Sequence, residues 1–144
     1  MKILVIQGPN LNLLGLLSKG QPQRVTLDRL NKELRSAAAT EEVKLSIYQL
    51  QDEARASKII QQHRSKAAGL LLLPGIWGKT GNLLLETTKI TALPLAVGQL
   101  ILPGSPWGDD KDLIFSEYAG LERKCNSLEE VAALLVEFIA QLKK

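Results

Sequence analysis

The sequence is poor in the side chains on which many catalytic and metal sites depend. Its 144 residues include one histidine, His63, and one cysteine, Cys125. These two ligands are too few for a zinc site built from histidine and cysteine, and a single cysteine cannot form an intrachain disulfide. A Cys-His or Ser-His-Asp triad would have to use His63, which lies in the polar stretch IIQQHRSK of an expected helix and is interpreted as a solvated side chain. We therefore expect no metal ion and no cofactor.

Strong charge and long apolar runs are also missing. The formal net charge is +3 and no cluster of Lys and Arg stands out, so we expect no nucleic-acid partner, although a small anionic ligand remains possible. The amino-terminal stretch MKILVIQGPN is too short in apolar residues for a signal peptide or a membrane span. These features predict a cytoplasmic protein, with residues 1–144 forming a single domain.

Apolar runs alternate along the chain with segments of helical period. The expected helices begin after Thr26, cover Ala54–Lys66 and Thr80–Ile90, and restart at the capping box of Ser127 and Glu130. The expected strands are Lys2–Gln7, Val43–Gln49, Gly69–Leu73, Pro94–Leu100 and a more polar one within Ile114–Cys125. Leu11–Arg24 and Leu102–Asp112 are expected as loops. This order predicts an α/β fold with a mostly parallel five-stranded sheet and helices on both faces.

Ligands of such sheets bind beyond the carboxyl ends of the strands. The relevant segments are Gly8–Asn12, Leu16–Arg24, Pro74–Gly81 and Gln99–Trp107. Within them we expect a pocket lined by Asn10, Asn12, Gly75, Trp77, Lys79, Thr80 and Gln99.

The most specific pattern is Gly8-Pro9-Asn10-Leu11-Asn12-Leu13-Leu14-Gly15, directly after the first strand. It resembles the signature of the type II 3-dehydroquinate dehydratases. Leu73-Pro74-Gly75 also falls where that family has Asn-Pro-Gly or Asn-Ala-Gly, and the likeness covers most of the chain, thinning after Leu102. The resemblance implies a flavodoxin-like three-layer domain of the shikimate pathway that assembles as a homo-oligomer of trimers, up to a dodecamer. The glycines and asparagines of the motif would equally suit a turn with a purely structural purpose.

The family's reaction removes water from 3-dehydroquinate to give 3-dehydroshikimate. Such an elimination needs a base, stabilisation of an enolate, and an acid for the departing hydroxyl. The resemblance implies a loop Tyr as base, a loop Arg that lowers its pKa, a His as acid, and Asn residues that position a water.

Most of the family's reactive positions carry a different residue in this chain. Asn12 and the backbone-shaping Gly75 match the family. The replaced positions are Leu17 for the loop Arg, Pro22 for the loop Tyr, Leu73 for the Asn before Pro-Gly, Lys79 for the acid His, Val97 for a Glu, Gln99 for a second His, Ile101 for the Ser that grips the substrate carboxylate, and a position near Asp110 for a downstream Arg.

Three hypotheses follow. The first is a non-catalytic relative with a binding, regulatory or assembly role, and the second is a dehydratase with substituted residues. The third is different chemistry with Lys79 as base or Schiff-base amine, desolvated beside Trp77. Against the third, Lys79 would also suit a solvated helix terminus, with Thr80 as the cap of that helix.

Two features suit contact with further copies of the chain. The apolar stretch from Leu95 to Leu102 is longer than one strand needs, and Trp77 and Trp107 lie in expected loops. A tryptophan in such a loop suits either a pocket wall or a subunit contact.

Overall fold

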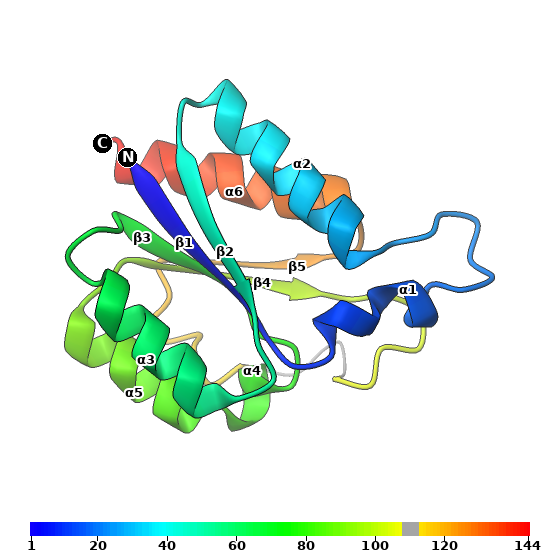
Figure 1. The fold of residues 1–144 in the computed structure, drawn as a ribbon, viewed down its shortest axis with the longest axis horizontal. Coiled ribbons are helices and arrows are strands. Elements are labelled where there is room, and N and C mark those ends of the chain that lie inside the picture. The colour runs from blue at the N-terminus through cyan, green and yellow to red at the C-terminus, as the bar shows by residue number, and fades with distance from the viewer. Residues whose placement is uncertain (108–112) are drawn as a thin grey trace.

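A fully parallel sheet of five strands forms the centre of the protein. The computed structural model describes residues 1–107 and 113–144. The sheet has the order β2-β1-β3-β4-β5, and each neighbouring pair is parallel (Figure 1). The strands are β1 (Lys2–Gln7), β2 (Lys44–Gln49), β3 (Gly69–Leu73), β4 (Leu95–Leu100) and β5 (Leu121–Cys125). The predicted α/β fold is confirmed, and this order is that of flavodoxin-like domains.

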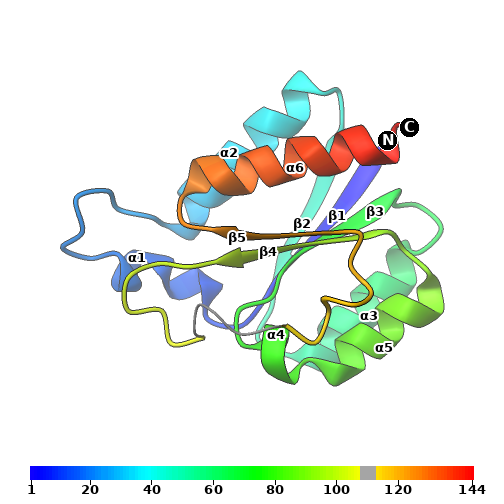
Figure 2. The same cartoon turned by 180° about the vertical axis from the view of Figure 1, so that it is seen from behind.

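Helices cover both faces of the sheet. The helices α2 (Leu27–Thr40) and α6 (Leu128–Leu142) lie on one face, and α3 (Glu53–His63) and α5 (Asn82–Thr91) lie on the other (Figure 2). Three short helices follow the carboxyl ends of strands: η1 (Leu11–Leu13), α1 (Leu14–Leu17) and α4 (Trp77–Thr80). The two chain termini lie side by side at the opposite end of the sheet (Figure 1).

The inner strands are mostly apolar because both of their faces are covered. Along β1, Ile3 and Val5 point into the core beneath α2 and α6, whereas Leu4 and Ile6 point into the core beneath α3 and α5. All four side chains are fully buried. This accounts for the continuous apolar runs of β1, β3 and β4, as expected of a parallel sheet between two helical layers.

Side chains cap three of the long helices at their amino ends. Thr26 accepts a hydrogen bond from the backbone N–H of Arg29 at 3.2 Å, and Ser127 does the same for Glu130 at 3.2 Å. The Glu130 carboxylate accepts the backbone N–H of Asn126, one residue before the cap. Asp52 accepts the N–H of Ala54 at 2.9 Å. The predicted caps at Thr26 and Ser127 are therefore confirmed.

The third long helix begins differently from its prediction. Thr80 is not its cap: it ends α4 and donates its hydroxyl to the carbonyl of Ile76 at 3.2 Å. The cap residue of α5 is Gly81, which has no side chain to offer. The Glu53 carboxylate takes over this function from α3, because it accepts the N–H of Leu84 at 2.9 Å. A contact between two helices thus replaces the local cap that the sequence suggested.

The fifth strand agrees with its prediction, whereas one segment expected as a loop is partly helical. The strand covers Leu121–Cys125, within the predicted segment Ile114–Cys125, and the preceding residues form turns that bury Phe115 completely. The segment expected as a loop after residue 10 begins with η1 and α1 instead. Leu11 and Leu14, one helical turn apart, are both buried there.

The chain leaves β1 by crossing closely over the segment that follows β3. The N–H of Gly8 donates to the carbonyl of Leu73 at 2.8 Å. A Cβ atom at Gly8 would lie 2.0 Å from the carbonyl oxygen of Pro74, so only glycine fits. On the facing segment Gly75 has a φ of 57°, and a Cβ there would lie 3.2 Å from the carbonyl oxygen of Pro9. The two loops therefore pack backbone against backbone.

Replacing Gly8 by alanine should destabilise the fold strongly. The added methyl must displace the backbone of Pro74, and overpacking of this kind costs about 1–3 kcal/mol or more. Gly15→Ala is the matched control, because a Cβ at Gly15 meets its nearest atom, Thr26 Cγ2, at an ordinary 3.5 Å. Urea unfolding should show a marked loss for Gly8→Ala and a change within about 0.5 kcal/mol for Gly15→Ala. Equal effects would contradict the crossing.

Removing the Glu53 carboxylate should weaken the start of α5. Glu53→Ala leaves the N–H of Leu84 without its partner, and loss of a cap costs about 1 kcal/mol. Glu86→Ala, an exposed glutamate on α5 itself, should change the free energy of unfolding by less than about 0.5 kcal/mol. Chemical denaturation of the two variants measures the difference, and indistinguishable midpoints would rule out the capping role.

Candidate functional site

The loop after β1 is tied to the end of β2 by amide side chains. The N–H of Asn10 donates to Gln51 Oε1 at 2.7 Å, and Gln51 Nε2 donates to Asn10 Oδ1 at 2.9 Å. Gln49 Nε2 donates to the carbonyl of Gly8 at 3.0 Å. Asn10 adopts the left-handed conformation, with a φ of 67°, which asparagine tolerates better than most residues. Asn10 therefore has a structural use here, whereas Asn12 lies exposed on η1.

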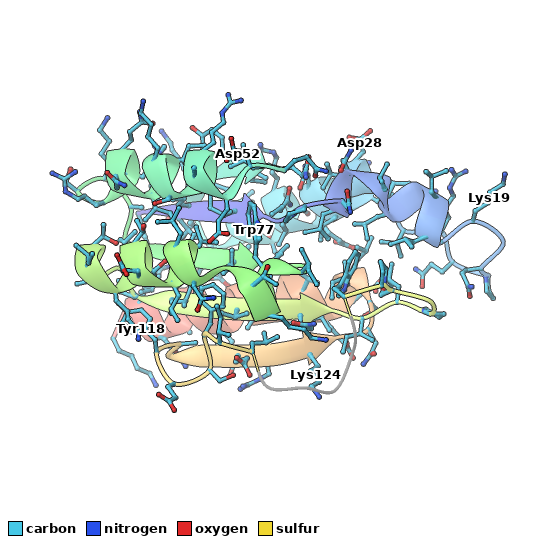
Figure 3. All side chains as sticks on the ribbon, turned by 90° about the horizontal axis from the view of Figure 1, so that it is seen from below. Lys19, Asp28, Asp52, Trp77, Tyr118 and Lys124 are labelled. Atoms are coloured by element: carbon cyan, nitrogen blue, oxygen red, sulfur yellow. The ribbon has the colours of Figure 1, made fainter. Side chains whose placement is uncertain are left out.

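The side chains of α4 that were expected to line one pocket point in different directions. Trp77 is 4% exposed and packs in the core beneath α3 and α5, inside the outline of the molecule (Figure 3). Lys79 and Thr80 lie exposed on the outer side of α4. The desolvation beside Trp77 that the Schiff-base hypothesis assigned to Lys79 is absent, so this premise was wrong.

The positions expected to replace family residues in β3 and β4 are buried. Leu73 is 1% and Val97 is 0% exposed. The Gln99 side chain is also buried and lies near α4, because a Cβ at Gly78 would be 3.4 Å from Gln99 Oε1. Ile101 is half-buried. The predicted position near Asp110 lies outside the described residues.

The two expected loop positions differ from each other in burial. Leu17 is half-buried and packs against the core beneath α2 and α6. Pro22 is exposed on the segment 19–24, which projects beyond the sheet and includes Lys19 (Figures 1 and 3). The pocket expected from Asn10, Asn12, Gly75, Trp77, Lys79, Thr80 and Gln99 stays a prediction.

Ser18 closes the base of the projecting loop, a role that sequence reasoning missed. It is 2% exposed, and its Oγ accepts the N–H of Val25 at 2.9 Å. The same Oγ lies 2.7 Å from the carbonyl of Val25 and 2.9 Å from that of Leu14, and its one proton can serve either carbonyl. The sequence signal that could have indicated this role is a small polar residue between a leucine-rich segment and a loop that contains glycine and proline.

A cavity of about 250 Å³ opens between this loop and the start of α6. Of the residues expected at the site, only Pro22 borders it. We call it the loop cavity and define it by its lining residues: Ser18, Gln21, Pro22, Gln23, Val25, Leu102, Pro103, Asn126, Ser127 and Leu128.

The histidine and the cysteine lie outside the chain segments that were expected to line the site. His63 ends α3, where its Nδ1 lies 3.0 Å from the carbonyl of Ile59 and its ring meets the edge of Tyr48 with centroids 5.6 Å apart. Burial raises the pKa of the Cys125 thiol to about 11, which keeps it protonated and unreactive at neutral pH. Within residues 1–107 and 113–144, no three His, Cys, Asp or Glu side chains are grouped as a metal site would require.

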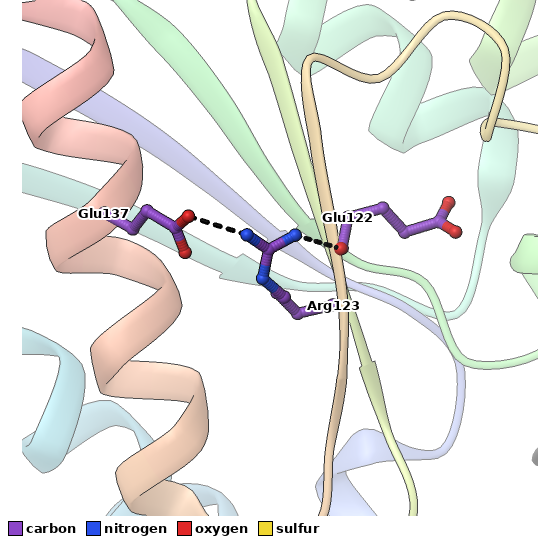
Figure 4. A network of polar contacts seen from close by, with 3 residues as sticks. All are labelled: Glu122, Arg123 and Glu137. Atoms are coloured by element: carbon purple, nitrogen blue, oxygen red, sulfur yellow. Dashed lines mark hydrogen bonds and ion pairs between the residues drawn. The ribbon is translucent and has the colours of Figure 1, made fainter.

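An exposed ion pair joins the edge strand β5 to α6. Arg123 on β5 contacts the Glu137 carboxylate on α6 at 2.7 Å and donates to the carbonyl of Glu122 at 2.8 Å (Figure 4). Both partners of the pair are about half exposed, and such surface pairs contribute little to stability. None of the helices in the described part of the chain is long and apolar enough to cross a membrane.

Comparison with known proteins agrees with the architecture. Two solved structures match the whole chain: a type II dehydroquinase from Butyrivibrio crossotus, with a TM-score of 0.80 at 17% identity over 98% of that chain, and a 3-dehydroquinate dehydratase-like protein from Bifidobacterium longum, with a TM-score of 0.70 at 15% identity over 99% of that chain. At these identities the likeness concerns the fold.

Sequence comparison extends the likeness to the family. Proteins named 3-dehydroquinate dehydratase from Carboxydothermus hydrogenoformans and Trichodesmium erythraeum are 35% and 40% identical over 54% of this chain. The matched part spans about half the length of each relative, 50% and 52%. The family model described as Dehydroquinase class II matches residues 1–97, about two thirds of the sequence, and on this match the chain belongs to the class II dehydroquinase family.

Proposed function

We propose that this protein is a class II dehydroquinase homologue that does not dehydrate 3-dehydroquinate and instead has a binding, regulatory or assembly role. The observation that carries the proposal is the burial of Leu73, where the resemblance places a catalytic Asn. A Cβ at Gly98 would lie 2.9 Å from Leu73 Cδ2 and 2.8 Å from Leu134 Cδ2, so the Leu73 side chain fills the core under α6. An alkyl group in this position cannot hold a water on an enolate.

The titratable groups near the carboxyl ends of the strands also favour the proposal. In the described residues of Gly8–Asn12, Leu16–Arg24, Pro74–Gly81 and Gln99–Trp107, they are Lys19, Arg24 and Lys79, and all three are exposed. These three groups include no carboxylate, histidine, tyrosine or cysteine that could act as the acid or base of the family's reaction.

A second candidate function is dehydration of 3-dehydroquinate with substituted residues. It is favoured by the names of the relatives, both 3-dehydroquinate dehydratases. Chemistry based on Lys79 is less favoured because this side chain is exposed and is not enclosed beside Trp77.

We also propose that the protein is a cytoplasmic homo-oligomer built from trimers, as the family resemblance implies. The apolar stretch up to residue 102 gives this assembly no support, because Leu100 and Leu102 are 3% and 7% exposed within one copy. Sedimentation of the purified chain should give a trimer or a multiple of it, and a monomer at micromolar concentration would contradict the assembly.

The purified protein mixed with 3-dehydroquinate should produce no enone absorbance above the uncatalysed rate. Loss of a matched acid or base costs about 10²- to 10⁴-fold in rate, and groups that act as a unit leave little behind once several are replaced. The Carboxydothermus relative serves as the positive control. Turnover above about one per second, within the usual range of enzymes, would contradict the proposal.

A variant with the family residues restored tests the reason for inactivity. It combines five substitutions: Leu17→Arg, Pro22→Tyr, Leu73→Asn, Lys79→His and Gln99→His. Leu73→Asn buries an amide in the core at a cost of about 1–3 kcal/mol, so the melting temperature must be measured together with turnover. If the unmodified chain proves active, Lys79→Ala decides between lysine chemistry and other groups.

A further inference from the structure

We propose that the loop cavity is a binding site for a small uncharged ligand, an aromatic ring bearing one amide group. The inference goes beyond the proposed function, because Pro22 alone among the described positions that the family resemblance assigns borders this cavity. Binding there and turnover of 3-dehydroquinate can be measured separately, so each can fail without the other.

The lining of the loop cavity contains no charged side chain. Its apolar walls come from Val25, Leu102, Pro103 and Leu128, and the remaining polar side chains are amides and hydroxyls. This neutrality is unusual for a chain in which 23% of the residues are charged. Apolar walls with a few uncharged polar groups are typical of small-molecule sites.

The size of the loop cavity limits the ligand to one ring with a short substituent. Its volume is about 250 Å³. An apolar cavity of about 150 Å³ accommodates benzene, so the loop cavity has room for a ring and a few further atoms.

The free hydrogen-bonding groups favour an amide on that ring. The hydroxyls of Ser18 and Ser127 already serve the protein, at the base of the loop and at the cap of α6. The side chains of Gln23 and Asn126 are exposed at the lining. Each carries both a donor and an acceptor, which complements a ligand amide.

The electrostatics of the nearby helix disfavour an anion. The amino end of α6 carries about half a positive charge, which alone would attract a carboxylate. Glu129 and Glu130 lie in its first turn, and the Glu130 carboxylate already accepts the N–H of Asn126. Two full negative charges outweigh the half charge of the helix. A neutral ligand therefore suits this cavity better than an anion, and the small anionic ligand that the sequence left open stays a prediction.

Benzamide and benzoate provide a matched test, because they share ring and shape and differ in charge. We expect benzamide at millimolar concentration to shift the amide NMR signals of Gln23 and Asn126 in ¹⁵N-labelled protein at pH 7. Benzoate should bind at least tenfold more weakly. Equal or tighter binding of benzoate, or no shifts with benzamide, would overturn the proposal.

Two tryptophan substitutions in the loop cavity and one control substitution check where benzamide binds. Asn126→Trp should obstruct the loop cavity and weaken benzamide binding at least tenfold, whereas Asn82→Trp, an exposed Asn in the first turn of α5, should leave it unchanged. Gln23→Trp lies on the exposed loop, where folding does not depend on the side chain, and should weaken binding similarly. Unchanged affinity in both cavity variants would overturn the assignment.

Discussion

The close crossing of the backbone at Gly8 over Pro74 is the constraint on which the carboxyl end of the sheet depends. It joins the exits of β1 and β3, which are neighbours in the sheet. The carbonyl of Gly8 is also held by Gln49, and Asn10 by Gln51, so the exit of β2 joins the same unit. Gly8 and Asn10, in the first half of the motif Gly8–Gly15, thus have structural functions that do not depend on any reaction.

The second half of the motif acts through the core. Leu11 and Leu14 are buried and anchor η1 and α1, and the chain then reaches Ser18 with its hydroxyl enclosed. That hydroxyl closes the base of the projecting loop, and the loop forms one wall of the loop cavity. The motif itself does not line the loop cavity, but its two short helices lead the chain to Ser18, which does.

The sequence predicts most of the fold because local patterns and burial agree. The bounds of β1 and β3 match the apolar runs, and the caps at Thr26 and Ser127 are local. The cap of α5 could not be predicted, because its acceptor, Glu53, comes from another helix. The fifth strand lies within the predicted segment Ile114–Cys125, but its first residue could not be predicted, since an apolar residue such as Phe115 can be buried in a turn as well as in a strand.

The candidate site was harder to predict, because the sequence places a residue at the end of a strand without fixing its direction. Trp77 and Trp107 were expected in loops, as a pocket wall or a subunit contact. Both are buried within one copy, and Trp107 Nε1–H donates to the carbonyl of Leu100 at 2.7 Å. Lys79 lies two residues after Trp77 on a single helical turn and is exposed. The direction in which these side chains point is decided by tertiary packing. The local sequence of such a short helix carries little information about it.

If the protein does not catalyse the family's reaction, as proposed, Leu73 and Val97 show why the catalytic side chains would be difficult to restore. Leu73 belongs to the core beneath α2 and α6, whereas Val97 belongs to the core beneath α3 and α5. Polar groups at both positions would need new partners on both faces of the sheet, and each unpaired buried amide or carboxylate opposes folding. Side chains restored singly would lower stability without completing a site, because the catalytic groups act only together. The packing of both cores therefore favours the apolar residues at these two positions.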